Sequence, residues 1–186
     1  MNEQLSSMVR QYVEWKTDLL TIQEESQFVE SYLKLQKYRF GSRLSYSIEI
    51  QQECSGYKIP KLSLLTFVEN ACVHGIEDKA AHCWIFVKVF TKQEYLYMEI
   101  EDTGSGISEA YLSTLRDRME HASIEMLKQS GRVGVVNACL RLKMFTDGNV
   151  KFTLESEENV GTIVTISVPV QFLNREAEKD AKSSDC

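Results

Sequence analysis

Apolar residues recur at helical spacing in two stretches near the start of the chain. The first stretch predicts a helix over residues 1–15. The second predicts a helix from Thr21 to about Phe40, because Thr21 and Glu24 have the spacing of a capping box at a helix start. Gly41 comes directly afterwards, and glycine commonly ends helices because it accepts a positive φ.

Apolar and polar residues alternate in several later segments, which predicts strands. Residues 43–51 form the first of these segments. Pro60 is typical of a first helical turn, so a helix is expected from there to about Gly75. Further along, the pattern predicts strands over 83–91, 95–101, 150–156 and 162–169, partly helical structure over 108–133 and a helix over 134–146. This mixed order favours an α+β sandwich, in which one sheet is covered by helices.

The composition excludes several classes of protein. A formal net charge of −6 argues against a nucleic-acid binder, but it leaves open a small phosphate ligand held by backbone amides and a metal ion. The sequence contains neither a membrane-length apolar stretch nor a signal-peptide pattern. The five cysteines lack CxxC spacing, so we expect reduced thiols, with Cys72 and Cys139 in the core and no zinc site.

The predicted helix that ends near Gly75 has two unlike faces. A polar face carries Thr66, Glu69, Asn70 and His74, and the apolar face consists of Leu64, Leu65, Val68, Ala71, Cys72 and Ile76. Solvated faces usually carry Lys, Glu and Gln. A carboxylate, a carboxamide and an imidazole together can instead ligate a cation, accept a proton or contact a phosphate. From this helix alone, a solvated face and a functional site remain equal alternatives.

Three glycine motifs follow. The sequence Asp102-Thr103-Gly104-Ser105-Gly106 comes directly after a predicted strand, where sheets often bind ligands, although a plain surface turn has the same composition. Gly131-Arg132-Val133-Gly134 precedes a predicted helix, whose free amides can hold a phosphate unless the segment is simply a loop. Gly161-Thr162 alone indicates only a hairpin turn. A Walker P-loop, GxxxxGK[ST], is absent from the chain.

In this order, the segments resemble the nucleotide-binding boxes of the histidine kinase, Hsp90, gyrase and MutL ATPase superfamily. VENACVHG at 68–75 resembles the N box and DTGSGI at 102–107 the first glycine box, while residues 131–137 and Gly161-Thr162 resemble the other two. ESYLKLQKYRF at 30–40 and KIPKL at 58–62 narrow the resemblance to LytS/YesM-type sensor histidine kinases. The resemblance covers roughly residues 5–170 and implies a two-layer sandwich that binds ATP and Mg²⁺.

The resemblance also implies a role for each matching residue. Glu69 would act as a base or position water during phosphoryl transfer, Asn70 would hold Mg²⁺, and His74 would lie near the phosphates. Asp102 would accept a hydrogen bond from the adenine amino group with support from Thr162. In the first glycine box, Gly104 and Gly106 would admit the base and sugar beside Ile107. Residues 108–133 would form a lid over ATP. The second glycine box, with Gly131, Arg132 and Gly134, would lie at the end of that lid.

Two positions depart from the pattern that the resemblance supplies, and at one of them Val135 replaces a leucine. Arg132 stands where the family's lid usually has a glycine, five residues before Asn137. Its side chain either restricts the backbone or supplies a cation to the phosphates, and both alternatives remain open. ATP affinity or lid closure is expected to be weaker than in the family.

By the same resemblance, residues 1–20 would be a remnant of the dimerisation and phosphoacceptor helix, residues 21–170 the ATP-binding catalytic domain, and residues 171–186 a charged, disordered tail. The parent would be a membrane-anchored bacterial sensor kinase, homodimeric in full length, with this domain in the cytoplasm. Its partners would be the phosphoacceptor domain and a response regulator. The family's PHFLFN-like histidine segment does not occur in the sequence, so autophosphorylation of this chain is not expected.

Other functions compete with this interpretation. A transfer-inactive nucleotide-binding module of the same superfamily is the main alternative, and an anti-sigma kinase is a related one. The helix before Phe40 favours a sensor kinase over an anti-sigma factor. A purely structural domain would have no reason to keep Glu69, Asn70 and Asp102 together.

Overall fold

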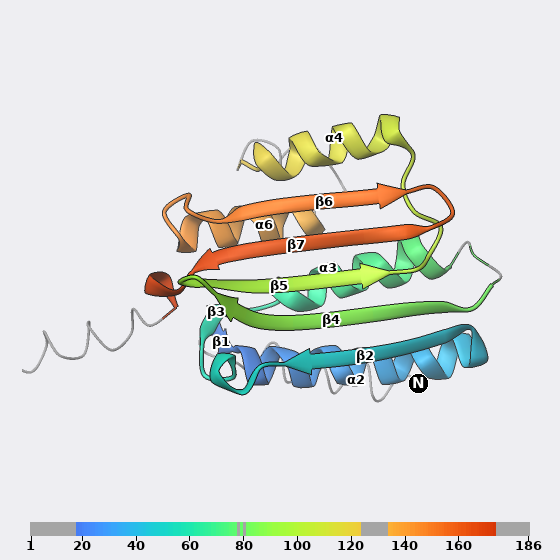
Figure 1. The fold of residues 1–186 in the computed structure, drawn as a ribbon, viewed down its shortest axis with the longest axis horizontal. Coiled ribbons are helices and arrows are strands. Elements are labelled where there is room, and N and C mark those ends of the chain that lie inside the picture. Colours follow the sequence, from blue (N-terminus) through green and yellow to red (C-terminus); the bar gives the residue numbers. More distant parts are fainter. Residues whose placement is uncertain (1–17, 78, 80, 124–133, 174–186) are drawn as a thin grey trace, which may run out of the picture.

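Five strands form one mixed sheet in the computed structural model, which describes residues 18–77, 79, 81–123 and 134–173 (Figure 1). The spatial order is β2-β4-β5-β7-β6, in which only the β2–β4 pair is parallel. The strands are β2 (Leu44–Ile50), β4 (Cys83–Lys92), β5 (Tyr95–Asp102), β6 (Lys151–Glu157) and β7 (Gly161–Pro169). The predicted strands are therefore confirmed, with end shifts of at most one residue.

Helices cover one face of this sheet and one of its edges. Helices α2, α3 and α6 lie behind the sheet in Figure 1, and α4 runs beside the edge strand β6. Their bounds are Ile22–Phe40 for α2, Ser63–Asn70 for α3, Glu109–Glu120 for α4 and Gly134–Phe145 for α6. The predicted α+β sandwich is confirmed. None of these helices, nor any other in the described ranges, is long and apolar enough to span a membrane.

The start of α2 is the capping box that the sequence predicts. The Thr21 side chain accepts from the Glu24 N–H at 3.2 Å, and Glu24 Oε2 accepts from the Thr21 N–H at 2.8 Å. At the other end Gly41 has φ +59°, so the positive-φ stop is also confirmed. The predicted helix over 1–15 and the tail from Asn174 lie outside the described residues.

The prediction for Pro60 is wrong. It is not in a first helical turn but ends the short strand β3 (Lys58–Pro60), which pairs antiparallel with β1 (Leu19–Thr21). Helix α3 begins three residues later, after Leu62 at φ +67°. A residue far away in the sequence stabilises the start of α3. The buried Glu25 carboxylate of α2 accepts hydrogen bonds from the backbone N–H groups of Leu62, Leu64 and Leu65. These N–H groups have no partner within their own helix.

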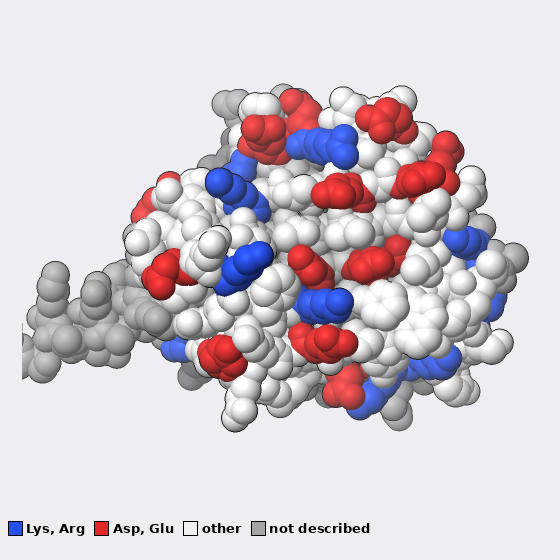
Figure 2. Space-filling model, viewed as in Figure 1, with Lys and Arg blue, Asp and Glu red and all other residues white. Residues whose placement is uncertain are grey.

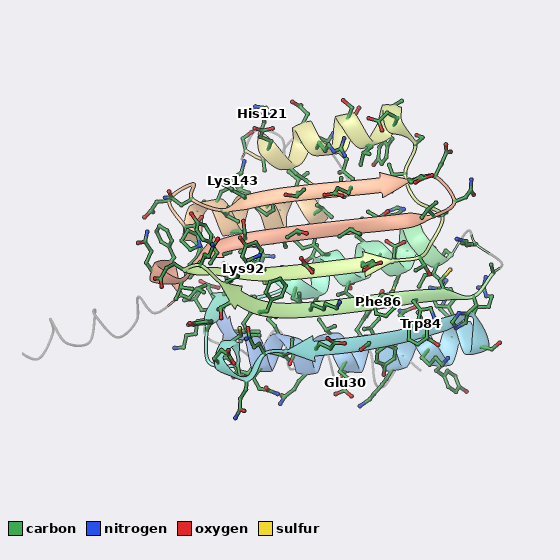
Figure 3. All side chains as sticks on the ribbon, in the orientation of Figure 1. Glu30, Trp84, Phe86, Lys92, His121 and Lys143 are labelled. Atoms are coloured by element: carbon green, nitrogen blue, oxygen red, sulfur yellow. The ribbon has the colours of Figure 1, made fainter. Side chains whose placement is uncertain are left out.

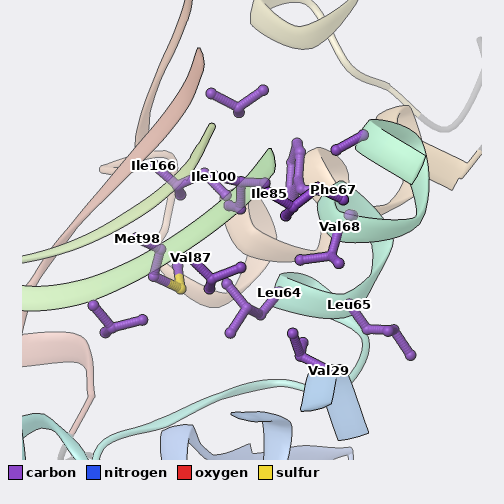
Figure 4. Close-up of a cluster of buried hydrophobic side chains, with 14 of the residues drawn as sticks. Val29, Leu64, Leu65, Phe67, Val68, Ile85, Val87, Met98, Ile100 and Ile166 are labelled. Carbon is purple, nitrogen blue, oxygen red and sulfur yellow. The ribbon is translucent and has the colours of Figure 1, made fainter. Parts of the chain in front are cut away.

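The core lies between the sheet and the helix layer. Figure 4 shows side chains from α2, α3, β4, β5 and β7 converging there, with Leu64 and Phe67 of α3 facing Val87 and Ile100 of the sheet. The apolar face predicted for α3 is confirmed as buried, including Cys72 at 1% exposure. Cys139, at 0%, is also a core residue as predicted, and the four cysteines within the described ranges are free thiols.

The opposite face of the sheet is open and carries mixed charges (Figure 2). Trp84 and Phe86 of β4, labelled in Figure 3, stack there with ring centroids 5.3 Å apart. Strand β5 alternates between the two faces, so every second residue from Leu96 through Met98 and Ile100 is buried against the helices. The same alternation carries the last residue of the strand, Asp102, to the buried face.

Candidate nucleotide site

A pocket opens between α3 and the end of β5. Six of the predicted site residues line it, namely Asn70, His74, Asp102, Gly106, Ile107 and Thr162. The lining is completed by Phe67, Ala71, Gly75, Ile100 and Val164. The pocket thus combines apolar residues of the core with a few polar groups, which is the usual composition of a small-molecule site.

Asp102 is the buried charged residue among those that line this pocket. Its side chain is 6% exposed, and its Oδ1 accepts from the Gly104 N–H at 2.8 Å. Burial raises the pKa of Asp102 from 3.8 to about 6, although the N–H groups of Gly104 and Thr162 and the charge of Lys79 oppose the rise. A buried carboxylate with spare acceptor capacity can bind a ligand N–H group strongly.

The loop after Asp102 is wedged against its neighbours. A Cβ on Gly104 would lie 2.2 Å from the Gly75 carbonyl oxygen, and a Cβ on Gly75 would lie 2.6 Å from Asp102 Oδ1. Gly106 has φ +66° and passes equally close to the backbone of Glu157. Gly104 therefore does not line the pocket but lets the loop pack beneath it. Gly75 is equally necessary for this close packing. In the sequence, only its position at the end of the N-box-like segment indicates such a role.

Hydrogen bonds hold this loop on both sides. The Ser105 N–H donates to the Gly75 carbonyl at 2.9 Å, and the Ser105 hydroxyl donates to the His74 carbonyl at 2.8 Å. From the other side, the Asn159 N–H in the β6–β7 turn donates to the Ser105 carbonyl at 2.7 Å. Lys79 also contacts the loop, and no sequence motif singled it out.

Thr162 lies opposite Asp102 in the β5–β7 ladder and is 8% exposed. Its hydroxyl is 2.9 Å from the Ser156 hydroxyl. Ser156 in turn donates to the Gly161 carbonyl at 2.8 Å and accepts from the Ile107 N–H at 2.9 Å. Ser156 therefore joins the last predicted box to the first glycine box, a link that the sequence analysis missed.

The polar face of α3 ends at the pocket. Asn70 is the last α-helical residue, and the chain continues as one π-helical segment, Ala71–Ile76. Such π-helical turns are rare and often occur at functional sites. His74 is exposed at the pocket rim, whereas Glu69 is exposed one residue before Asn70 and does not line the pocket. Partial desolvation raises the pKa of the Glu69 carboxyl above 4.5.

The second predicted glycine box is only partly described. Gly134 begins α6 and faces α3, since a Cβ there would lie 3.6 Å from Thr66 Cγ2. Gly131 and Arg132 lie outside the described residues. Within the described ranges, no cluster of three or more His, Cys, Asp or Glu side chains could hold a metal ion. A cation here would need the Asn70 carboxamide oxygen together with oxygens of a bound ligand, a set that suits Mg²⁺.

Comparisons with curated proteins find sensor kinases. The chain is 27% identical over 169 residues to the sensor histidine kinase YesM of Bacillus subtilis, covering 91% of this chain and 27% of that protein. It is 30% identical over 151 residues to the sensor protein LytS of Bacillus anthracis, covering 81% of this chain and 25% of that protein. The chain thus spans about a quarter of the length of these relatives.

Solved structures agree in fold. The histidine kinase domain of the Erythrobacter litoralis EL346 blue-light activated kinase has a TM-score of 0.57 at 16% identity, over 91% of this chain and 72% of that one. The catalytic domain of the histidine kinase ThkA has a TM-score of 0.55 at 15% identity, over 81% of this chain and 93% of that one.

Two family models match the sequence. A histidine kinase model matches residues 1–44. The model of histidine kinase-, DNA gyrase B-, and HSP90-like ATPases matches residues 60–171, which contain the whole pocket. The chain therefore belongs to the histidine kinase-, DNA gyrase B-, and HSP90-like ATPase family, and the curated relatives that it matches are sensor kinases.

Proposed function

We propose that this chain binds ATP with Mg²⁺ in the pocket between α3 and β5 and presents the γ-phosphate to a histidine of a phosphoacceptor domain. The observation that carries the proposal is the buried Asp102 carboxylate, which lines the pocket and has capacity for a further donor. The exocyclic amino group of adenine is such a donor. Ile100 and Val164 line the same pocket and offer apolar surface to the base.

The other lining residues divide the remaining work. Asn70, at the end of α3, would contribute a carboxamide oxygen to Mg²⁺, and His74 would lie beside the phosphates. When bound, the metal ion would neutralise charge on the phosphate oxygens. Glu69, one residue earlier, would accept the proton of the incoming imidazole or position a water molecule. Desolvation raises the pKa of its carboxyl above the usual value, which makes the carboxylate a stronger base than that of a solvated glutamate.

The proposed partners follow from the family. The phosphoryl group would pass to a histidine other than His74, His82 and His121, and then to an aspartate of a response regulator. Because the matched relatives are sensor proteins, we place this domain on the cytoplasmic side of a membrane-anchored kinase.

Calorimetric titration with ADP and a non-hydrolysable ATP analogue, with and without Mg²⁺, tests the binding step. Asp102→Asn should weaken binding by about 1–3 kcal/mol, because its amide offers a poorer match to the adenine amino group. Glu99→Gln is the matched control, since Glu99 lies on the open face of the same strand. If the wild type keeps its fold but binds neither nucleotide, the proposal is wrong.

The transfer step needs a second assay. The chain is mixed with a separately produced phosphoacceptor segment of a LytS/YesM-type kinase and labelled ATP. We expect phosphohistidine on the added segment, and a rate that falls by about 10²-fold or more in Glu69→Gln, as for the loss of a general base. Nucleotide binding without any transfer would assign the chain to the transfer-inactive class instead.

A further inference from the structure

The ammonium group of Lys79 lies among three backbone carbonyls. Its Nζ donates to Thr103 O at 3.0 Å, to Gly104 O at 2.9 Å and to Asn159 O at 3.1 Å. An ammonium group has three N–H donors, so these acceptors use all of them. Two acceptors belong to the loop that follows Asp102, and the third belongs to the β6–β7 turn.

The backbone of Lys79 is itself fixed. Its N–H donates to the Ile76 carbonyl at 3.2 Å, and its carbonyl accepts from Arg43 Nη1 at 2.9 Å. The side chain therefore extends from an anchored point rather than from a free loop. Holding a lysine side chain in one conformation costs up to about 2 kcal/mol of rotamer entropy, which three charge-assisted hydrogen bonds can offset.

The acceptors of Lys79 are the groups whose placement shapes the pocket. Thr103 and Gly104 immediately follow Asp102, and the Gly104 N–H donates to the Asp102 carboxylate. Asn159 also binds this loop through its N–H, which donates to Ser105. Without the ammonium group, the loop and the turn would keep that one hydrogen bond, but the peptide between Thr103 and Gly104, whose N–H orients the carboxylate, would lose the donor to its carbonyl.

We propose that Lys79 is a positioning residue of the nucleotide site, which fastens the Thr103–Ser105 loop to the β6–β7 turn and so fixes the Asp102 carboxylate toward the bound base. The inference rests on the proposed nucleotide site but concerns a residue that acts through Asp102 rather than on the ligand. The positive charge of Lys79 also favours the ionised form of Asp102.

Nucleotide-free protein gives the first test. In Lys79→Ala, the N–H groups of Gly104, Ser105 and Asn159 should exchange with deuterium at least about tenfold faster than in the wild type, because the loop and the turn that carry them are no longer joined through Lys79. Lys88→Ala, on the open face of β4, is the matched control and should leave these rates unchanged. Unchanged exchange in Lys79→Ala would overturn the proposal whether or not the protein binds nucleotide.

Nucleotide affinity gives the second test. We expect Lys79→Ala to bind ADP about tenfold or more weakly, the equivalent of about one charge-assisted hydrogen bond. Added n-propylammonium, which replaces the deleted side-chain atoms, should restore part of the affinity, whereas tetramethylammonium, which lacks N–H donors, should not. Equal effects of the two cations would overturn the proposal. Lys79→Gln, with a neutral donor, is the second variant if Lys79→Ala fails to fold, and it should show the same faster exchange.

The pH dependence separates positioning from general destabilisation. Asp102 is faced by Lys79, by the Glu101 carboxylate, and by the thiols of Cys72 and Cys83. Lys79 is the one cation of this set, so its loss should raise the pH at which ADP affinity falls on acidification. A variant that merely loosens the fold would weaken ADP binding without moving this midpoint, and that result would contradict the proposal. Failure of the wild type itself to bind ADP would instead refute the proposed function and leave the exchange test standing.

Discussion

Replacing Asp102 by Asn should increase the stability of the nucleotide-free protein relative to the wild type as the pH rises to neutral, although it removes the proposed adenine acceptor. The carboxyl is nearly inaccessible to water, and burial raises its pKa from 3.8 to about 6. At about 1.4 kcal/mol per pKa unit, the folded protein gives up about 3 kcal/mol when this group ionises. Asn has a similar shape and never ionises, so it avoids this cost.

The sign of the pH dependence follows from linkage. A carboxyl whose folded-state pKa is raised stabilises the fold fully below its unfolded-state pKa near 3.8, and that contribution is lost as the pH rises through about 6. The free energy of unfolding of the wild type should therefore fall relative to that of Asp102→Asn between about pH 4 and pH 7. The amide cannot accept as the carboxylate does from the Thr162 N–H, but that penalty is nearly the same at every pH.

Urea denaturation of both proteins at closely spaced pH values between about 4 and 7.5 measures this difference. Most other titrating groups cancel, because both proteins contain them. We expect the difference in unfolding free energy to change by up to about 3 kcal/mol in favour of Asp102→Asn as the pH rises. A difference that stays constant, or that moves in favour of the wild type, would show that Asp102 does not titrate with a raised pKa in the folded protein.

Three further substitutions test other parts of the site. Glu25→Ala should lower the unfolding free energy by about 1–3 kcal/mol in urea titration, because the first N–H groups of α3 lose their acceptor. The control Glu30→Ala, at an exposed position of the same helix, should change it by less than about 0.5 kcal/mol. Gly75→Ala should abolish ADP binding in calorimetry, because the added Cβ would lie 2.6 Å from Asp102 Oδ1; wild-type affinity would show that the loop can move aside freely. Asn70→Ala should remove the Mg²⁺-dependent part of ATP-analogue affinity and keep the Mg²⁺-independent part, and a uniform loss of both would contradict a metal-ligating role.

Local patterns were sufficient for most of the fold. Alternation identified the five long strands, and the Thr21–Glu24 pair fixed the start of α2, because these signals depend on residues close in sequence. The alternation in β5 also brings Asp102 to the buried face without any long-range information. The three-residue strands β1 and β3 were too short for a periodic signal. Because Pro60 belongs to β3, helix α3 starts later than the sequence predicted.

The contacts that complete the site depend on distant residues. Glu25 caps a helix 37 residues further along the chain, and Lys79 binds carbonyls 24, 25 and 80 residues away. The partners of both side chains are backbone N–H and carbonyl groups, which every residue type carries. No sequence motif therefore marks either residue. A single sequence carries no record of such pairs, whereas the box residues Asn70 and Asp102 could be found from their type and order.

Both ends of the segment that carries Asn70 are held by other elements. At its start, the Glu25 carboxylate of α2 accepts from the first N–H groups of α3, and Arg141 of α6 donates to the Lys61 carbonyl at 2.6 Å. At its end, the backbone of Gly75 packs against Asp102. Since α3 and its π-helical extension form one continuous rod, a shift of α2 or α6 at the start must either strain these contacts or move Asn70 relative to Asp102. The placement of Asn70 relative to Asp102 therefore depends on contacts with α2, which lies within residues 1–44 that the histidine kinase model matches.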